Sequence, residues 1–290
     1  MASAAQWLEG ARPRTLPAAV APVLVGSGAA AALDGFVLGR ALLALVVSLA
    51  LQVGVNYAND YSDGIRGTDA DRVGPMRLVG SGAATPRQVL TATVLAFAVA
   101  AVAGLVLAAM SSWWLLAVGA ACIVAAWTYT GGPIPYGYRA LGEIFVFVFF
   151  GLVAVVGTTF VQTRTVEPLA FAAAVPVGLL IVAILVVNNL RDIPGDEAVG
   201  KRTLAVVLGD RATRVGYIAL LVGAFVAIMG IGLVRPWALL GLVAAPLAVP
   251  PGRIVLGGGR GPELIAALQG TGLLTLLTGV MLGIGTALSG

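Results

Sequence analysis

The stretch QVGVNYANDYSDGIRGTDAD, Gln52–Asp71, ends a long apolar run with a dense group of Asn and Asp residues. A second stretch, NNLRDIPGDEAVGKRT, Asn188–Thr203, ends another apolar run far downstream. Each carries an Asn four residues before an Asp: Asn56 precedes Asp60, and Asn188 precedes Asp192. We expect both stretches to leave an apolar segment, open a polar loop and form two walls of one site.

The composition around these stretches is that of a membrane protein. Hydrophobic residues make up 59% of the 290 residues and charged residues only 10%, whereas soluble domains carry about 25% charged residues. Such a chain cannot cover a water-facing surface. It predicts an all-α integral membrane fold, whose spans each need roughly 20 apolar residues.

Nine transmembrane helices are predicted from apolar length and from breaks at Pro, Gly and charge. Their ranges are 15–33, 37–58, 87–110, 113–130, 141–162, 168–190, 212–234, 237–256 and 263–288. We expect Pro246, Pro250 and Pro251 to kink or shorten the eighth. Polar loops are expected at 61–86 and 191–211, both longer than ordinary bundle connections of about 2–8 residues.

Basic residues are unevenly divided between the two sides that nine spans define. Fourteen of the 17 lie on the side of the N-terminus, and only Arg40, Arg164 and Arg235 lie on the other. Positive charge marks the cytoplasmic side. The N-terminus and both Asp stretches are therefore predicted to face the cytoplasm, and no secretory signal pattern precedes the first span.

The chain is predicted to be one polytopic membrane domain, residues 1–290, made of two pseudo-equivalent halves of roughly 1–140 and 141–290. The repeated Asn-to-Asp spacing at Asn56 and Asn188 is the observation behind this division. The composition offers no nucleic-acid-binding pattern, and the oligomeric state is left open.

The residue types narrow the chemistry of the site. The chain has no His and a single Cys, which excludes His-based catalysis and thiolate metal sites. Asp60 with Asp63, and Asp192 with Asp196, are spaced to share one helix face. Oxygen ligands alone are typical of Mg²⁺, and two such walls suit Mg²⁺ holding a diphosphate. Cations that complete a phosphate site are available in nearby loops: Arg66, Arg72, Arg139, Arg191, Lys201 and Arg202.

Three function classes fit these residues: an enzyme that acts on a Mg²⁺-bound diphosphate, an ion-coupled transporter and a phosphotransferase. A transporter would hold its acids near the bilayer midplane, whereas here they lie at span ends. A phosphotransferase would need one cluster of four acids instead of two separated pairs. Asp69 and Asp71 lie in the loop proper, and the spacing assigns them no role.

The motifs resemble those of the UbiA-type superfamily of intramembrane prenyltransferases. That family carries Asn-Asp-x-x-Asp and Asp-x-x-x-Asp, here Asn59-Asp60-Tyr61-Ser62-Asp63 and Asp192-Ile193-Pro194-Gly195-Asp196. Where the family's longer first motif places a further Asp, this chain has Gly67, and its next acid is Asp69. The resemblance implies nine transmembrane helices around a central cavity, with both motifs at its cytoplasmic mouth in a bacterial inner membrane.

The resemblance is greatest to the branch that prenylates 1,4-dihydroxy-2-naphthoate in menaquinone synthesis. It extends over RPRTLPAAVAPVLVG (12–26), residues 52–82, YTGGPIPYGYRALGE (129–143) and residues 188–209. It implies Mg²⁺ as cofactor, polyprenyl diphosphate and the naphthoate as substrates, membrane lipid around the prenyl chain, and release of CO₂. Another aromatic acceptor, such as 4-hydroxybenzoate, remains an alternative.

The implied site residues fall into four groups. As catalytic residues we expect Asp60, Asp63, Asp192, Asp196 and Lys201. The Mg²⁺ ligands are expected to be the same four Asp residues with Asn56 and Asn188. Diphosphate binding is assigned to Lys201, Arg139, Arg72, Arg66 and Asn59. Acceptor binding or stabilisation of an allylic cation is assigned to Tyr138, Tyr129 and Gln52.

Overall fold

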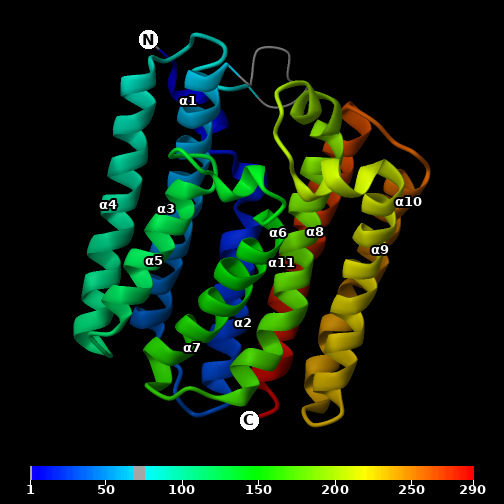
Figure 1. The fold of residues 1–290 in the computed structure, drawn as a ribbon. Helices are drawn as coiled ribbons and strands as arrows, with labels where there is room; N and C mark the ends of the chain where they lie inside the picture. The colour runs from blue at the N-terminus through cyan, green and yellow to red at the C-terminus, as the bar shows by residue number, and fades with distance from the viewer. Residues whose placement is uncertain (1, 68–75) are drawn as a thin grey trace.

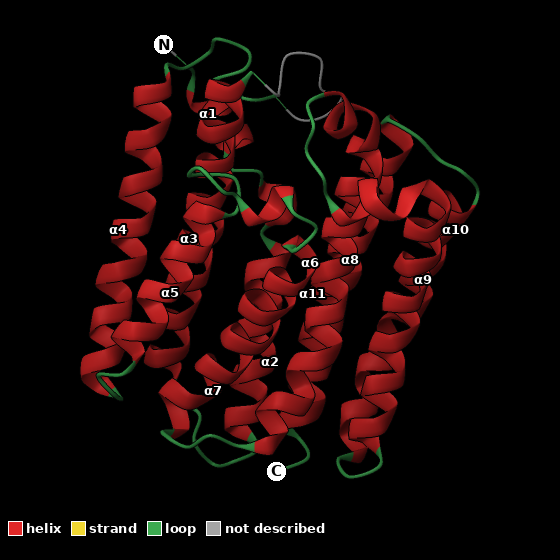
Figure 2. Ribbon diagram, viewed as in Figure 1, coloured by secondary structure: helices red, strands yellow, loops and turns green. Residues whose placement is uncertain are grey.

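The computed structural model describes residues 2–67 and 76–290, and over these ranges the fold is entirely helical (Figures 1 and 2). The two chain ends lie at opposite ends of the bundle (Figure 1). The helices are α1 (Ala4–Gly10), η1 (Pro13–Thr15), α2 (Pro17–Ala31), α3 (Leu38–Arg66), α4 (Pro86–Met110), α5 (Leu115–Thr128), η2 (Tyr136–Tyr138), α6 (Gly142–Val146), η3 (Phe147–Val153), α7 (Ala154–Thr163), α8 (Pro168–Ala198), α9 (Leu204–Gly232), η4 (Pro236–Ala248), α10 (Val249–Leu256) and α11 (Pro262–Ala287).

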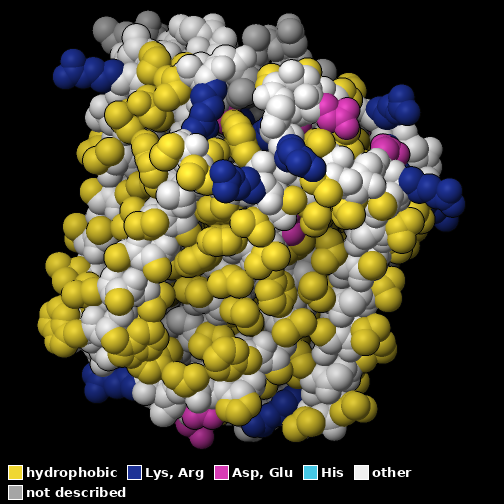
Figure 3. Space-filling view, in the orientation of Figure 1, with side chains coloured by type: hydrophobic (Ala, Val, Ile, Leu, Met, Phe, Trp, Pro, Cys, Tyr) yellow, Lys and Arg dark blue, Asp and Glu magenta, His cyan; other side chains and the backbone are white. Residues whose placement is uncertain are grey.

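Seven helical segments in the described part of the chain are long and apolar enough to cross a membrane. They are α3, α4, the continuous α6–η3–α7 segment, α8, α9, the η4–α10 segment and α11. The other two predicted spans coincide with α2 and α5, which have 15 and 14 residues. All nine predicted ranges therefore fall on helices, but only seven of these helical segments in the described part of the chain are long enough to cross a membrane. On the face shown in Figure 3, hydrophobic side chains cover the middle of the bundle, and most charged side chains lie toward its two ends.

The prediction that the Asp stretches open polar loops was wrong. α3 continues past residue 58 to Arg66 and ends at Gly67, whose φ of 72° is the left-handed cap that glycine favours. α8 continues past residue 190 to Ala198, through Pro194. Both Asp pairs are therefore the last turns of long helices. The helices can continue through these carboxylates because neighbouring donors satisfy them, as described below.

The prolines of the eighth predicted span act as expected. Residues Pro236–Ala248 form 3₁₀ turns, and a short α-helix, α10, follows from Val249. Proline removes a backbone donor and clashes with the carbonyl four residues earlier, so it disfavours regular α-helix here.

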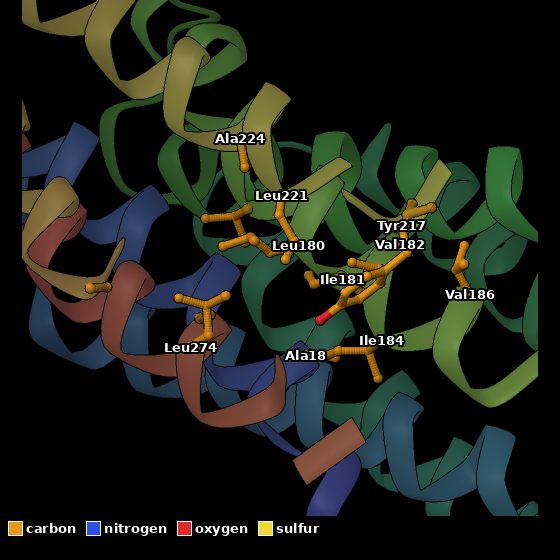
Figure 4. Packing of buried hydrophobic residues seen from close by; sticks show 14 of the residues in the cluster. Ala18, Leu180, Ile181, Val182, Ile184, Val186, Tyr217, Leu221, Ala224 and Leu274 are labelled. Atoms are coloured by element: carbon orange, nitrogen blue, oxygen red, sulfur yellow. The ribbon is translucent and has the colours of Figure 1, made fainter. Parts of the chain in front are cut away.

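α8 is the central helix of the bundle. In its most apolar window 72% of the residues are buried, against 22–50% for the other six long segments. Leu180, Ile184, Tyr217 and Leu221 belong to one core cluster between α8 and α9, and Ala18 brings α2 into it (Figure 4). This packing fixes the end of α8, and hence the second Asp pair, relative to the rest of the bundle.

Glycine allows α2 and α11 to pack backbone to backbone. A Cβ placed on Gly28 would come within 2.2 Å of the carbonyl oxygen of Gly283. Small residues that permit such approach are typical of helix contacts in membranes. The contact places α2 beside the site, against both α8 and α11.

Candidate functional site

A cavity of about 320 Å³ lies inside the bundle. Its walls come from α2, α3, α4, α5, the α6–η3–α7 segment and α8. Most of the lining is apolar, including Leu107, Leu115, Phe149 and Val153. One group of polar and charged residues also lines it: Arg12, Gln52, Asn56, Asn59, Asp63, Arg77, Asn188, Asn189 and Lys201. The cavity therefore suits a molecule with an apolar body and a charged or polar head.

The first wall is the end of α3, with Asn56, Asn59, Asp60 and Asp63. Asp60 is almost fully buried, and its two carboxylate oxygens accept hydrogen bonds from the backbone N–H groups of Leu78 (2.7 Å) and Val79 (3.0 Å). Asp63 lines the cavity. Asp60 thus holds the segment after residue 75 against α3, and Asp63 is the carboxylate of this pair on the cavity side.

The amide side chains of the first wall are held by neighbouring groups. Asn56 donates to the carbonyl of Ala11 (2.9 Å) and to the hydroxyl of Thr15 (3.0 Å). Gln52 donates to the same hydroxyl (3.0 Å), and Asn59 accepts from the hydroxyl of Thr130 (2.7 Å). These bonds tie α3 to the N-terminal segment and to the loop after α5, and they fix which atoms face the cavity.

The second wall is the end of α8, with Asn188, Asp192 and Asp196. Arg191 binds both carboxylate oxygens of Asp192, at 2.7 and 2.9 Å, and also the amide oxygen of Asn188 at 2.9 Å. Asp196 forms an ion pair with Lys201 at 3.3 Å. Lys201 lines the cavity, so it places a positive charge at the polar end.

Tyr138 connects the two walls. Its hydroxyl donates to Asp63 at 2.8 Å, and the ammonium of Lys201 lies 5.2 Å from the centre of its ring. The Arg66 guanidinium lies 5.4 Å from the same ring centre, within the range of a cation–π contact. One chain of contacts thus runs from Asp63 through Tyr138 and Lys201 to Asp196, which brings the two Asp pairs into one site.

Two of the other cations predicted to bind diphosphate, Arg66 and Arg139, do not share one environment. Arg66 donates to the backbone carbonyls of Thr130 and Gly132, beyond α5. Arg139 is exposed, and its backbone pairs with Arg202 in the loop between α8 and α9. Three further residues of the sequence prediction lie outside the described residues: Asp69, Asp71 and Arg72.

Two arginines of the site were not among the predicted site residues. Arg12 and Arg77 both line the cavity, and Arg77 is buried and forms an ion pair with Asp63 at 3.5 Å. Both lie inside the stretches that carry the family resemblance. Their position within these stretches could have indicated them as site residues. The proximity of Arg77 to Asp63, however, depends on tertiary structure.

Two phenols near the polar end are held in the protonated form. Burial raises the pKa of Tyr129 above its ordinary value of 10.0, and the nearby charges of Glu143, Asp63 and Asp196 raise it further. Burial also raises the pKa of Tyr136, whose hydroxyl donates to the carbonyl of Ala125 at 2.9 Å. Both side chains therefore remain hydrogen-bond donors at neutral pH.

The donor set fits Mg²⁺ bound together with a phosphate group, but not a closed protein cage. Within the described residues no three acidic or thiol side chains form a ready metal cluster. The cavity lining does offer the carboxylate of Asp63 from the first wall and amide side chains from both walls, including Asn56 and Asn188. Mg²⁺ typically takes one or two carboxylates and completes its shell with water and substrate phosphate.

Comparison with known proteins places this architecture in a family. Residues 19–255 match the model of the UbiA prenyltransferase family. The chain is 58% identical, over 96% of its length and 95% of the relative's, to a Mycobacterium tuberculosis protein named 1,4-dihydroxy-2-naphthoate octaprenyltransferase.

Solved structures of low identity share the fold. A UbiA homologue from Aeropyrum pernix superposes with a TM-score of 0.70 at 15% identity, covering 92% of this chain and 96% of that one. A UbiA homologue from Archaeoglobus fulgidus, bound to DMAPP and Mg²⁺, gives 0.61 at 17% identity, covering 97% and 99%. With its two Asp-bearing helix ends at one cavity and a family match over most of its length, this chain belongs to the UbiA prenyltransferase family.

Proposed function

We propose that this chain transfers a polyprenyl group from polyprenyl diphosphate to 1,4-dihydroxy-2-naphthoate, releasing diphosphate and CO₂ and forming demethylmenaquinol. The observation that carries the proposal is the 58% identity over 96% of the chain to a protein of that name. The cavity supports it, because its lining joins a charged end to an apolar body. Family membership favours it over the transporter and phosphotransferase alternatives.

The diphosphate is assigned to the polar end of the cavity, between the two walls. Lys201, Arg77 and Arg12 line this end and supply positive charge to phosphate oxygens. Asp63 and Asp196 flank them. Arg66, Arg139 and Arg72 remain proposed diphosphate ligands, and for Arg66 this role requires exchange of the carbonyl partners described above.

Mg²⁺ is proposed as the cofactor, held by Asp60, Asp63, Asp192 and Asp196 with Asn56 and Asn188 in support. When bound, it would neutralise charge that develops on the departing diphosphate. Asp60 and Asp192 now bind backbone N–H groups and Arg191 respectively. We propose that Asp60 and Asp192 exchange these partners when the head group binds and then join Asp63 and Asp196 in holding Mg²⁺. A homologue from A. fulgidus that binds DMAPP and Mg²⁺ supports the choice of Mg²⁺ as cofactor.

In the proposed reaction the allylic carbon–oxygen bond of the prenyl diphosphate breaks, and the electron pair leaves with the diphosphate. The allylic cation then bonds to the naphthoate ring carbon that bears the carboxylate. Loss of CO₂ returns its bonding pair to the ring and restores aromaticity. The residues Phe149, Val153 and Leu115 line a water-poor cavity that protects the cation from hydrolysis.

We propose that the chain crosses a bacterial inner membrane nine times, with its N-terminus and both Asp pairs on the cytoplasmic side. α2 and α5 are included as the shorter crossings, and termini at opposite ends of the bundle support an odd number (Figure 1). The repeated Asn-to-Asp spacing at the ends of α3 and α8 supports two pseudo-equivalent halves, 1–140 and 141–290.

The test is a transfer assay with purified protein in detergent, Mg²⁺ and a polyprenyl diphosphate. With 1,4-dihydroxy-2-naphthoate as acceptor, we expect prenylated product and CO₂ in equal amounts, and loss of both on addition of EDTA. Product formed only with 4-hydroxybenzoate would support prenyl transfer but show that the proposed acceptor is wrong. No product with any aromatic acceptor would overturn the proposed function.

A further inference from the structure

Asn189 follows Asn188 in sequence but faces a different neighbour. Asn188 accepts a hydrogen bond from Arg191 within its own helix. Asn189 instead donates from its Nδ2 to Oε1 of Glu143, on α6, at 3.0 Å. Both asparagines line the cavity, so the end of α8 presents two amides with different orientations. Only Asn188 belongs to the repeated Asn-to-Asp spacing.

Glu143 fixes which atom Asn189 turns toward the cavity. A carboxylate accepts hydrogen bonds, so the amide nitrogen of Asn189 must face it. The carbonyl oxygen Oδ1 is then the group that remains for the cavity. Within the described residues no donor is hydrogen-bonded to this oxygen. Glu143 is itself buried, at 8% exposure, and its Oε2 has no hydrogen-bond partner in the same part of the chain. A buried acceptor without a donor lowers the stability of the fold. The Glu143–Asn189 pair is therefore an unusual feature of an apolar bundle.

Tyr129 adds a donor close to Glu143, the residue that holds Asn189. Its hydroxyl lies beside Gly142, where a Cβ would come within 3.5 Å of it, and Gly142 directly precedes Glu143. Tyr129 lines the cavity, and as shown above it stays protonated. The same side of the cavity therefore offers one acceptor, Asn189 Oδ1, and one donor, Tyr129 Oη.

We propose that Asn189, held in place by Glu143, accepts a hydrogen bond from a hydroxyl group of the aromatic acceptor, while Tyr129 donates to an oxygen on the same molecule. Asn189 is then a binding residue and Glu143 a positioning residue that acts through it. This inference rests on the proposed function and assigns the acceptor's place within that site. A site built around a substrate hydroxyl discriminates against analogues that lack it, because the buried acceptor then has no donor.

The test compares equilibrium binding of three ligands: 1,4-dihydroxy-2-naphthoate and the two naphthoates that each lack one of its hydroxyls. We expect the wild-type protein to bind the dihydroxy compound about tenfold more tightly than at least one analogue, as expected for one buried hydrogen bond. In Asn189→Ala this ratio should fall to about one. Affinity for prenyl diphosphate should stay within about twofold of wild type. An unchanged ratio would overturn the proposal, and so would parallel loss of both affinities.

Matched variants separate binding from a general structural effect. Asn189→Leu, of similar size, gives the same readout if Asn189→Ala does not fold. Ser48→Ala removes another polar group of the cavity lining, a hydroxyl that donates to the carbonyl of Ala19 at 2.8 Å, and should leave the hydroxyl ratio as in wild type. Glu143→Gln keeps an oxygen that accepts from Asn189 and should retain the ratio, whereas Glu143→Leu should abolish it. Loss of the ratio in Glu143→Gln and its retention in Glu143→Leu would refute the positioning role.

The transfer assay distinguishes failure of this inference from failure of the proposed function. If wild-type protein prenylates the dihydroxynaphthoate but the ratio is insensitive to Asn189, only the placement of the acceptor is wrong. If wild-type protein neither binds nor prenylates it, the proposed function is wrong, and this inference is overturned with it.

Discussion

Replacing Tyr138 by phenylalanine removes the hydroxyl that joins the two walls and leaves the ring in place. The hydroxyl donates to Asp63 at 2.8 Å, and hydrogen bonds to charged groups contribute about 1.5–3 kcal/mol. Loss of that energy corresponds to a decrease of about 10- to 150-fold in kcat/KM. Since Tyr138 is only half-buried, we expect a value near the lower limit. The assay is steady-state prenyl transfer with the prenyl diphosphate varied.

A graded series sharpens this prediction. Tyr138→Leu also removes the ring that faces Arg66 and Lys201, at 5.4 and 5.2 Å. Two cation–π contacts of about 0.5–1 kcal/mol each add a further decrease of about 5- to 30-fold. The matched control is Tyr217→Phe. Its hydroxyl is hydrogen-bonded to Thr271 at 2.8 Å in the core, so its loss should lower the melting temperature and leave kcat/KM unchanged. Activity of Tyr138→Phe within twofold of wild type would refute the bridging role.

Three further predictions concern the Asp pairs, the packing of α2 on α11 and the buried phenols. Asp60→Asn and Asp192→Asn should each abolish transfer while the protein remains folded in the membrane, and near-wild-type turnover in either would contradict the assignment of the walls. Gly28→Ala should destabilise the bundle by about 1–3 kcal/mol, because its Cβ would lie 2.2 Å from the Gly283 carbonyl oxygen. The control is Gly216→Ala, whose Cβ meets no atom within 4 Å and which should not lower the melting temperature. Because the pKa values of Tyr129 and Tyr136 are raised, the folded protein keeps two protons that the unfolded chain loses near pH 10. The stability of the fold should therefore fall as pH rises above about 10. A melting temperature that stays flat across this range in wild type but not in a double Phe variant would contradict this prediction.

The positions of the helices could be predicted from apolar length, because a membrane requires long apolar segments that bond their own backbone. Their ends could not. α3 and α8 were predicted to end where charge begins, near residues 58 and 190. They extend to Arg66 and Ala198 because the backbone of residues 78–79 satisfies Asp60, and Arg191 satisfies Asp192. Partners for buried charge come from tertiary structure, which a pattern of hydropathy does not contain.

For the candidate site, several residues could be predicted from the sequence, but most of their side-chain contacts could not. Asp63 and Lys201 were identified from spacing and residue type, and the structure places both at the cavity. Tyr138 was predicted to bind the acceptor or stabilise an allylic cation, and that role stays a prediction. The sequence did not indicate the contacts of its ring with Arg66 and Lys201 or the hydrogen bond of its hydroxyl to Asp63. Arg77 was missed, because its ion pair with Asp63 joins residues 14 positions apart in the chain. Residue type indicated the chemistry, whereas the side-chain partners depended on the packing of loops onto helix ends.

The measurement that tests the central claim most directly is a cryo-electron microscopy structure with Mg²⁺ and a non-reactive prenyl thiodiphosphate bound. We predict the diphosphate between the ends of α3 and α8, in contact with Lys201 and Arg77, and the prenyl chain along the apolar lining beside Phe149. A diphosphate held by one wall alone, or bound outside this cavity, would contradict the account.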